Sequence, residues 1–98
     1  MKFVIGVVVN DTKLYVKSDN IWVPPKTLFT DNIDLAFLYK TEQLALERSR
    51  CLKVLAGDDR TWGTGFSVNG LDFKGPDIHQ VSVLTVKVTI VTISSKLV

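Results

Sequence analysis

The chain has 98 residues, which is enough for one domain with a single hydrophobic core and too few for a deep enclosed active site. Apolar residues make up 46% and charged residues 22%, so the composition excludes an intrinsically disordered protein. Twelve basic against ten acidic residues leave a net charge of +2, and their scatter lacks the basic concentration that nucleic-acid-binding proteins show.

The N-terminal part of the chain predicts a meander of three short strands. Residues 3–9 are continuously apolar and rich in β-branched side chains, which is typical of a strand covered on both faces. Asn10-Asp11 tolerates a left-handed backbone and predicts a turn into a second strand over residues 14–17. A third strand is expected over residues 21–23. Pro24-Pro25 ends it, because proline donates no ladder hydrogen bond.

Two helices are predicted in the middle of the chain. Candidate N-caps at residues 30–32 and an apolar i, i+3, i+4 pattern favour a short helix over residues 32–39. The main helix covers residues 42–56, with Thr41 as its N-cap and Gly57 as a left-handed C-cap. The residues that share its apolar stripe are Leu44, Ala45, Cys51, Leu52, Leu55 and Ala56. The thiol of Cys51 is therefore expected to be buried as a small hydrophobic group.

A hairpin is predicted over residues 66–73. Asn69-Gly70 is the preferred pair for a two-residue type I′ turn, whose twist suits the strands on either side. This register places Val68 opposite Leu71, and Phe66 opposite Phe73, with all four side chains on one face. The alternating residues between them are polar, so both faces of the hairpin are chemically consistent.

The last element is a long strand over residues 80–93, whose apolar phase slips along its length. The slip indicates either a central strand covered on both faces or bulges near residues 83 and 91, and we favour the central strand. Thr85, Lys87 and Thr89 are then expected on a partly exposed face. The predicted fold is α+β: a mostly antiparallel sheet of about five to six strands, packed against the two helices in a single domain.

Catalytic and metal-binding constellations are missing from the sequence. The chain holds one imidazole, His79, and one thiol, Cys51, so a four-ligand zinc site of cysteine and histidine is excluded. Asp58-Asp59 lacks the spacing of a calcium loop, and Gly63-Thr64-Gly65 lacks the rest of a phosphate-binding fingerprint. We therefore expect no enzyme activity, catalytic residue, metal or cofactor.

A partner surface is predicted on the glycine-rich loop after the main helix. Arginine and tryptophan are enriched at interface hot spots, and binding residues concentrate on loops held by a rigid scaffold. Trp62 can be an exposed anchor or a plug at the core edge, and Arg48 can extend its methylenes over the core or mark an interface. Trp22 alternates with Ile21 and Val23 and is expected in the core. The residues predicted to contact a partner are Asp58, Asp59, Arg60, Trp62, Phe66 and Arg48.

Residues 14–46 resemble small uncharacterised proteins of phages and prophages of Gram-positive bacteria. The matching motifs are Ile21-Trp22, then Thr30-Asp31 with Ala36, then Tyr39-Lys40-Thr41-Glu42 with Ala45. These positions are caps and core alanines, so the resemblance transfers no functional residue. It implies a phage-encoded product that acts in the host cytoplasm by inhibiting or redirecting a host protein.

The expected function is that of a small non-enzymatic accessory or inhibitor protein, directed at a host protein such as a defence or replication component, or at a phage protein. One cysteine fits a reducing cytoplasm, and no stretch approaches the roughly 18 apolar residues of a membrane span. A nucleic-acid-binding or DNA-mimicking module and a virion assembly component are the alternatives. The sequence also leaves a homodimer open.

Overall fold

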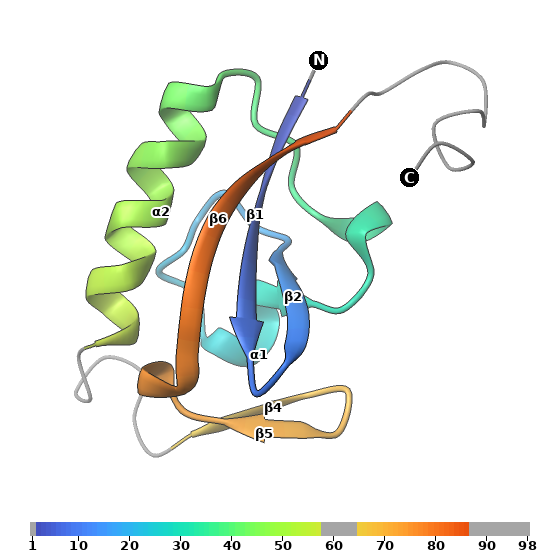
Figure 1. Ribbon diagram of the computed structural model, residues 1–98, viewed down its shortest axis with the longest axis vertical. Coiled ribbons are helices and arrows are strands. Elements are labelled where there is room, and N and C mark those ends of the chain that lie inside the picture. Colours follow the sequence, from blue (N-terminus) through green and yellow to red (C-terminus); the bar gives the residue numbers. More distant parts are fainter. Residues whose placement is uncertain (1, 58–64, 87–98) are drawn as a thin grey trace.

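The computed structural model describes residues 2–57 and 65–86, and these residues form an α+β fold, as predicted. A four-stranded antiparallel sheet has the order β3-β2-β1-β6, and a separate two-stranded sheet pairs β4 with β5 (Figure 1). The strands are β1 (Lys2–Val9), β2 (Thr12–Val16), β3 (Phe29–Thr30), β4 (Phe66–Val68), β5 (Leu71–Phe73) and β6 (Ile78–Val86). The helices are α1 (Pro25–Leu28) and α2 (Glu42–Ala56), with 3-10 turns η1 (Ile33–Leu35) and η2 (Gly75–Asp77).

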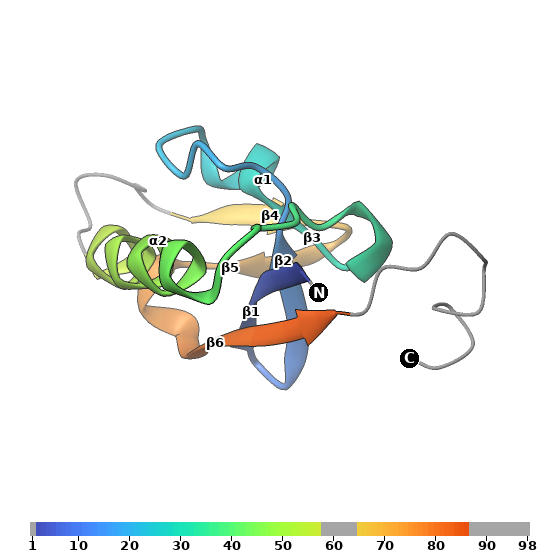
Figure 2. The ribbon, with the colours of Figure 1, turned by 90° about the horizontal axis from the view of Figure 1, so that it is seen from above.

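The core lies on one face of the larger sheet. Seen from above, α2, α1 and the β4–β5 hairpin all lie on the same side of β1 and β6 (Figure 2). Ile5, Val7 and Val9 of β1 point to that side and belong to the main buried cluster. Val4 points the other way and is also fully buried. The continuous apolar run of β1 thus reflects a central strand, as expected.

The first hairpin forms as predicted, but the third strand of the meander does not. Asn10 and Asp11 adopt φ of 47° and 66°, which joins β1 to β2 through a two-residue turn. Residues 21–23 form a turn instead of a strand. Their place in the sheet is taken by β3, which follows the one-turn helix α1 that Pro25 begins.

Helix α2 has the predicted bounds but faces the core at a different angle. Thr41 caps it as expected, accepting a hydrogen bond from the Leu44 amide at 3.2 Å. Cys51 is exposed, so its predicted burial is wrong. Ser49 lies on the buried face instead, and its hydroxyl donates to the Ala45 carbonyl at 2.8 Å, so it needs no water. Gly57 has φ of −81°, so the predicted left-handed C-cap is also wrong.

The short helix predicted over residues 32–39 is reduced to η1. After Leu35 the chain becomes extended and fills the end of the sheet between β2 and β1. The Phe37 amide donates to the Val16 carbonyl at 2.9 Å, and Tyr39 exchanges hydrogen bonds of 2.7 and 3.0 Å with Phe3. Backbone pairing with the sheet has displaced a helix that is too short to be stable alone.

The β4–β5 hairpin confirms the predicted turn and register. Asn69 and Gly70 have φ of 48° and 86°, and Phe66 pairs with Phe73. The rings of Phe66 and Phe73 meet edge to face at 4.1 Å between centroids, and the ring of Phe29 stacks on Phe66 at 6.1 Å. The hairpin therefore closes the core over β3.

Strand β6 pairs with β1 alone, so the central position favoured from sequence is wrong for the described part of this strand. The irregularity in its pairing lies opposite Val8 and Val9, not near residue 83. Val81 and Val83 face the core, whereas Leu84 lies on the other face over Gly6. Thr85 is exposed, as expected. The part of the prediction that covers residues 87–93, including Lys87 and Thr89, lies outside the described residues.

Candidate functional site

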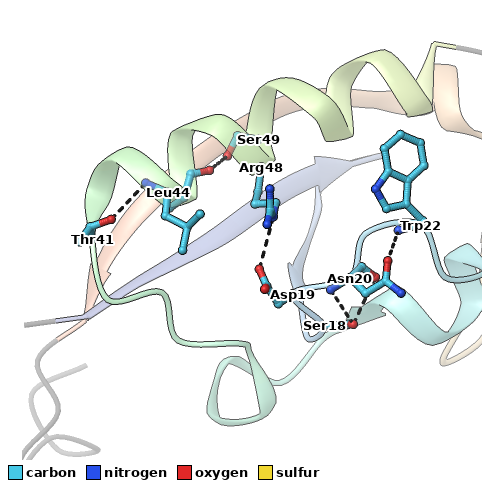
Figure 3. A network of polar contacts seen from close by, with 9 residues as sticks. Ser18, Asp19, Asn20, Trp22, Thr41, Leu44, Arg48 and Ser49 are labelled. Carbon is cyan, nitrogen blue, oxygen red and sulfur yellow. Dashed lines mark hydrogen bonds and ion pairs between the residues drawn. The ribbon is translucent and has the colours of Figure 1, made fainter.

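The residues predicted to contact a partner do not lie together on one described surface. Asp58, Asp59, Arg60 and Trp62 lie outside the described residues. Phe66 is half-buried and packs on Phe29 and Phe73, so it contributes to the core. Of the predicted set, Arg48 lies in a described region and on an accessible surface, where it faces the loop of residues 18–22 (Figure 3).

The loop of residues 18–22 is held by its own hydrogen bonds. The Asn20 amide donates a hydrogen bond to the Ser18 hydroxyl oxygen at 3.2 Å. The Ser18 hydroxyl in turn donates to the Asn20 carbonyl, also at 3.2 Å. The Asn20 side-chain oxygen accepts the Trp22 amide at 3.1 Å, which is the geometry of an Asx turn. Ile21 is 1% exposed and anchors the loop in the core.

Trp22 is the most unusual residue of this loop. It is 71% exposed, so its predicted burial is wrong. The Asx turn explains the difference, because it bends the chain where a strand would have continued and carries the indole out beside α2 (Figure 3). A large aromatic side chain on a rigid, exposed loop is typical of an interface anchor.

Arg48 ties α2 to this loop with one ion pair. Its Nε lies 3.4 Å from the Asp19 Oδ1, and within the described part of the chain this is its one polar contact. Both side chains are more than one third exposed, so the pair adds at most about 1 kcal/mol of stability. The terminal guanidinium nitrogens therefore remain able to bind a carboxylate or carbonyl of a partner.

Tyr39 lies close enough to this ion pair for both of its charges to act on the phenol. It is fully buried, and its hydroxyl has no hydrogen-bond partner among the described residues. The pKa of Tyr39 is raised from 10.0 to about 12, mainly by burial and also by the negative charge of Asp19, while the positive charge of Arg48 lowers it. A phenol with this pKa stays protonated at neutral pH.

We name the loop of residues 18–22, which carries Asp19 and Trp22, together with Arg48 of α2, the Trp22 surface. Sequence reasoning did not name Asp19, Trp22 or Tyr39 as parts of a candidate site, and it placed Trp22 in the core. Asn20, two residues before Trp22, was the signal for the turn that exposes the indole.

Comparison with protein-family models, with curated proteins and with solved structures finds no match to this chain. Among residues 2–57 and 65–86, no three metal-ligating side chains of His, Cys, Asp or Glu come together. No helix in this part of the chain is long and apolar enough to cross a membrane. The interpretation of the Trp22 surface therefore depends on its geometry alone.

Proposed function

We propose that this protein is a non-enzymatic protein-binding module whose partner docks on the Trp22 surface. The observation that carries the proposal is the 71% exposure of Trp22 on a loop fixed by hydrogen bonds and by a buried neighbour. Such a loop is already ordered, so binding loses little conformational entropy. The resemblance of residues 14–46 to phage proteins supports a phage origin and a host protein as the target.

The expected gain from covering Trp22 is large for one side chain. A tryptophan side chain buries roughly 150–250 Å² in a protein interior. With 71% of the residue in water, covering the indole stabilises a complex by about 3 kcal/mol at about 25 cal/mol per Å². Arg48 adds orientation, since a planar guanidinium binds a carboxylate through two parallel hydrogen bonds. The partner is expected to offer an apolar pocket with an acidic or carbonyl group beside it.

The test compares three immobilised proteins on one Gram-positive host lysate: wild type, Trp22→Ala and Leu35→Ala. Leu35 is a matched control because it is 61% exposed and lies on η1, away from α2 in both ribbon views (Figures 1 and 2). A partner of the Trp22 surface is retained by wild type and Leu35→Ala and is lost from Trp22→Ala. With the purified partner, Trp22→Ala is expected to weaken binding by roughly 100-fold, which corresponds to about 2.7 kcal/mol.

Equal retention by all three proteins would reject the Trp22 surface. Trp22→Ala should melt within a few degrees of wild type, because the indole contributes little to the core. Binding that falls steeply with salt and is competed by DNA would instead support the nucleic-acid alternative.

A further inference from the structure

The two edges of the larger sheet are protected very differently. At one edge, β3 is 2 residues long and is followed directly by Asp31. At the other edge, β6 runs for 9 residues, and no strand among residues 2–57 and 65–86 pairs with its outer side. A long unpaired edge offers a row of backbone donors and acceptors to another strand.

The hydrogen bonds of Phe3 show which backbone groups of β6 point outward. Its amide and carbonyl both bond to Tyr39, on the side of β1 away from β6. Sides alternate along a strand, so Val4, Gly6 and Val8 of β1 point toward β6. Their partners on β6 are Leu84, Ser82 and Gln80. The amides and carbonyls of the alternate residues Val81, Val83 and Thr85 therefore point outward.

Residues 80–86 of β6 lack the sequence features that normally prevent strand pairing. Residues 80–86 contain no charged residue and no proline. The pairing irregularity of the strand is confined to its first residues, opposite Val8 and Val9, so the outer side from Val81 to Thr85 is regular. Leu84, on the face opposite the core, is 37% exposed. A lysine, a proline or a bulge at the middle of an edge is the usual protection, and β6 has none of them there.

We propose that β6 pairs antiparallel with β6 of a second copy of this chain, across a two-fold axis at Val83. Val83 is the middle one of the three residues whose backbone groups point outward. This register is therefore the one that pairs the backbone groups of all three residues. Val83 pairs with Val83 of the second copy. Val81 of each copy pairs with Thr85 of the other. Leu84 then lies beside Ser82 of the second copy, on the face opposite the core. The two sheets join into one continuous sheet.

A second copy is favoured over an unrelated peptide because the edge is complementary to itself. Two uncharged strands meet without like-charge repulsion, and a two-fold axis satisfies the outward groups of both copies at once. In the register centred on Val83, the described residues that pair are 80–86, a stretch about 23 Å long, and a sheet with its covering layer is about 20 Å thick. The interface then covers roughly 460 Å² on each copy, in the range of weak complexes, so dissociation at concentrations of about 100 μM is expected. This inference is independent of the proposed function of the Trp22 surface.

The first experiment measures amide hydrogen exchange by NMR at about 20 μM and about 1 mM protein, with mass determined by sedimentation at both concentrations. The amides of Ser82 and Leu84 bond to β1 and should be protected at both concentrations. The amides of Val81, Val83 and Thr85 should exchange rapidly in the monomer and become protected in the dimer. Protection of these three amides in a protein of monomeric mass would mean that the chain itself occupies the edge, which would overturn the proposal.

The second experiment replaces Thr85 by proline, with Thr85→Ala as the matched control. Proline removes an outward amide without touching the bonds to β1, and edge strands tolerate it at such a position. Thr85→Pro should raise the dimer dissociation constant at least tenfold, whereas Thr85→Ala should leave it within about twofold. An unchanged dimer in Thr85→Pro, or a wild-type monomer at about 1 mM with rapid exchange at all three amides, would refute the proposal. If Thr85→Pro fails to fold, the exchange experiment on the wild-type protein decides alone.

Discussion

The contact between Gly75 and the end of α2 allows a sharp stability test. A Cβ added at Gly75 would meet the carbonyl oxygen of Ala56, with the Ala56 C at 2.9 Å and Cα at 3.0 Å. All of these are backbone atoms at the end of a helix, so a change of side-chain rotamer cannot relieve the clash. Gly75→Ala is therefore expected to lower the free energy of unfolding by about 3 kcal/mol, the upper end of the range for overpacking. For a domain of this size that loss lowers Tm by about 12–24 °C.

Gly57→Ala is the matched control, because Gly57 lies next to Ala56 and has room for an added Cβ. Its added Cβ would meet the Lys53 and Val54 carbonyl oxygens at 3.5 and 3.7 Å, which is ordinary contact, and its φ of −81° suits any residue. This change should raise the free energy of unfolding by about 0.4–1 kcal/mol, because it restricts the unfolded chain. Urea titrations of both variants give the two free energies. A Gly75→Ala protein as stable as wild type would refute the packing of η2 on α2, and a destabilised Gly57→Ala would restore the left-handed cap.

Three further changes test other local features. Gly70→Val should destabilise the domain by at least 1 kcal/mol or so in a urea titration, because a β-branched residue is strained at a φ of 86°; an unchanged midpoint would contradict the type I′ turn. Thr41→Ala should cost about 1 kcal/mol through loss of the α2 cap, and no loss would mean that the Leu44 amide finds another acceptor. Cys51, being exposed, should react with iodoacetamide nearly as fast in the folded protein as in urea, whereas slow native labelling would restore its predicted burial.

The features that sequence predicted correctly are those that a few neighbouring residues determine. Asn69-Gly70 specifies its turn by backbone preference alone, and the register of Phe66 and Phe73 follows from it. Thr41 acts on an amide three residues away. In each case both partners of the interaction lie within the predicted element, so no knowledge of the rest of the fold is needed.

The features that sequence missed depend on partners far along the chain. Tyr39 leaves the predicted short helix because Phe3, at the start of β1, offers it two hydrogen bonds. Ser49 replaces Cys51 in the buried face of α2, since the packing of α2 against β1 and β6 decides which side of the helix is covered. The exposure of Trp22 follows from a competition between a strand and an Asx turn, and hydrophobic periodicity favours the strand.

The buried hydroxyl of Tyr39 should make the protein unusually sensitive to alkaline pH. The pKa of this tyrosine is raised to about 12 in the folded chain, against 10.0 for an ordinary tyrosine, mainly because burial disfavours the phenolate. Above pH 10 the unfolded chain therefore loses this proton while the folded chain keeps it, so stability falls between pH 10 and about pH 12. The difference of about 2 pKa units corresponds to a loss of about 2.7 kcal/mol.

Urea titrations of wild type, Tyr39→Phe and Tyr15→Phe from pH 8 to pH 12 isolate this contribution. At pH 8, Tyr39→Phe should match or slightly exceed wild-type stability, because phenylalanine fills the same space without an unpaired hydroxyl. As pH rises through 10, wild type and Tyr15→Phe should lose stability faster than Tyr39→Phe, since both retain Tyr39. Parallel curves for wild type and Tyr39→Phe would contradict the raised pKa. A loss of more than about 1 kcal/mol in Tyr39→Phe at pH 8 would show instead that the hydroxyl is hydrogen-bonded, with Asp19, whose charge acts on Tyr39, as a candidate acceptor.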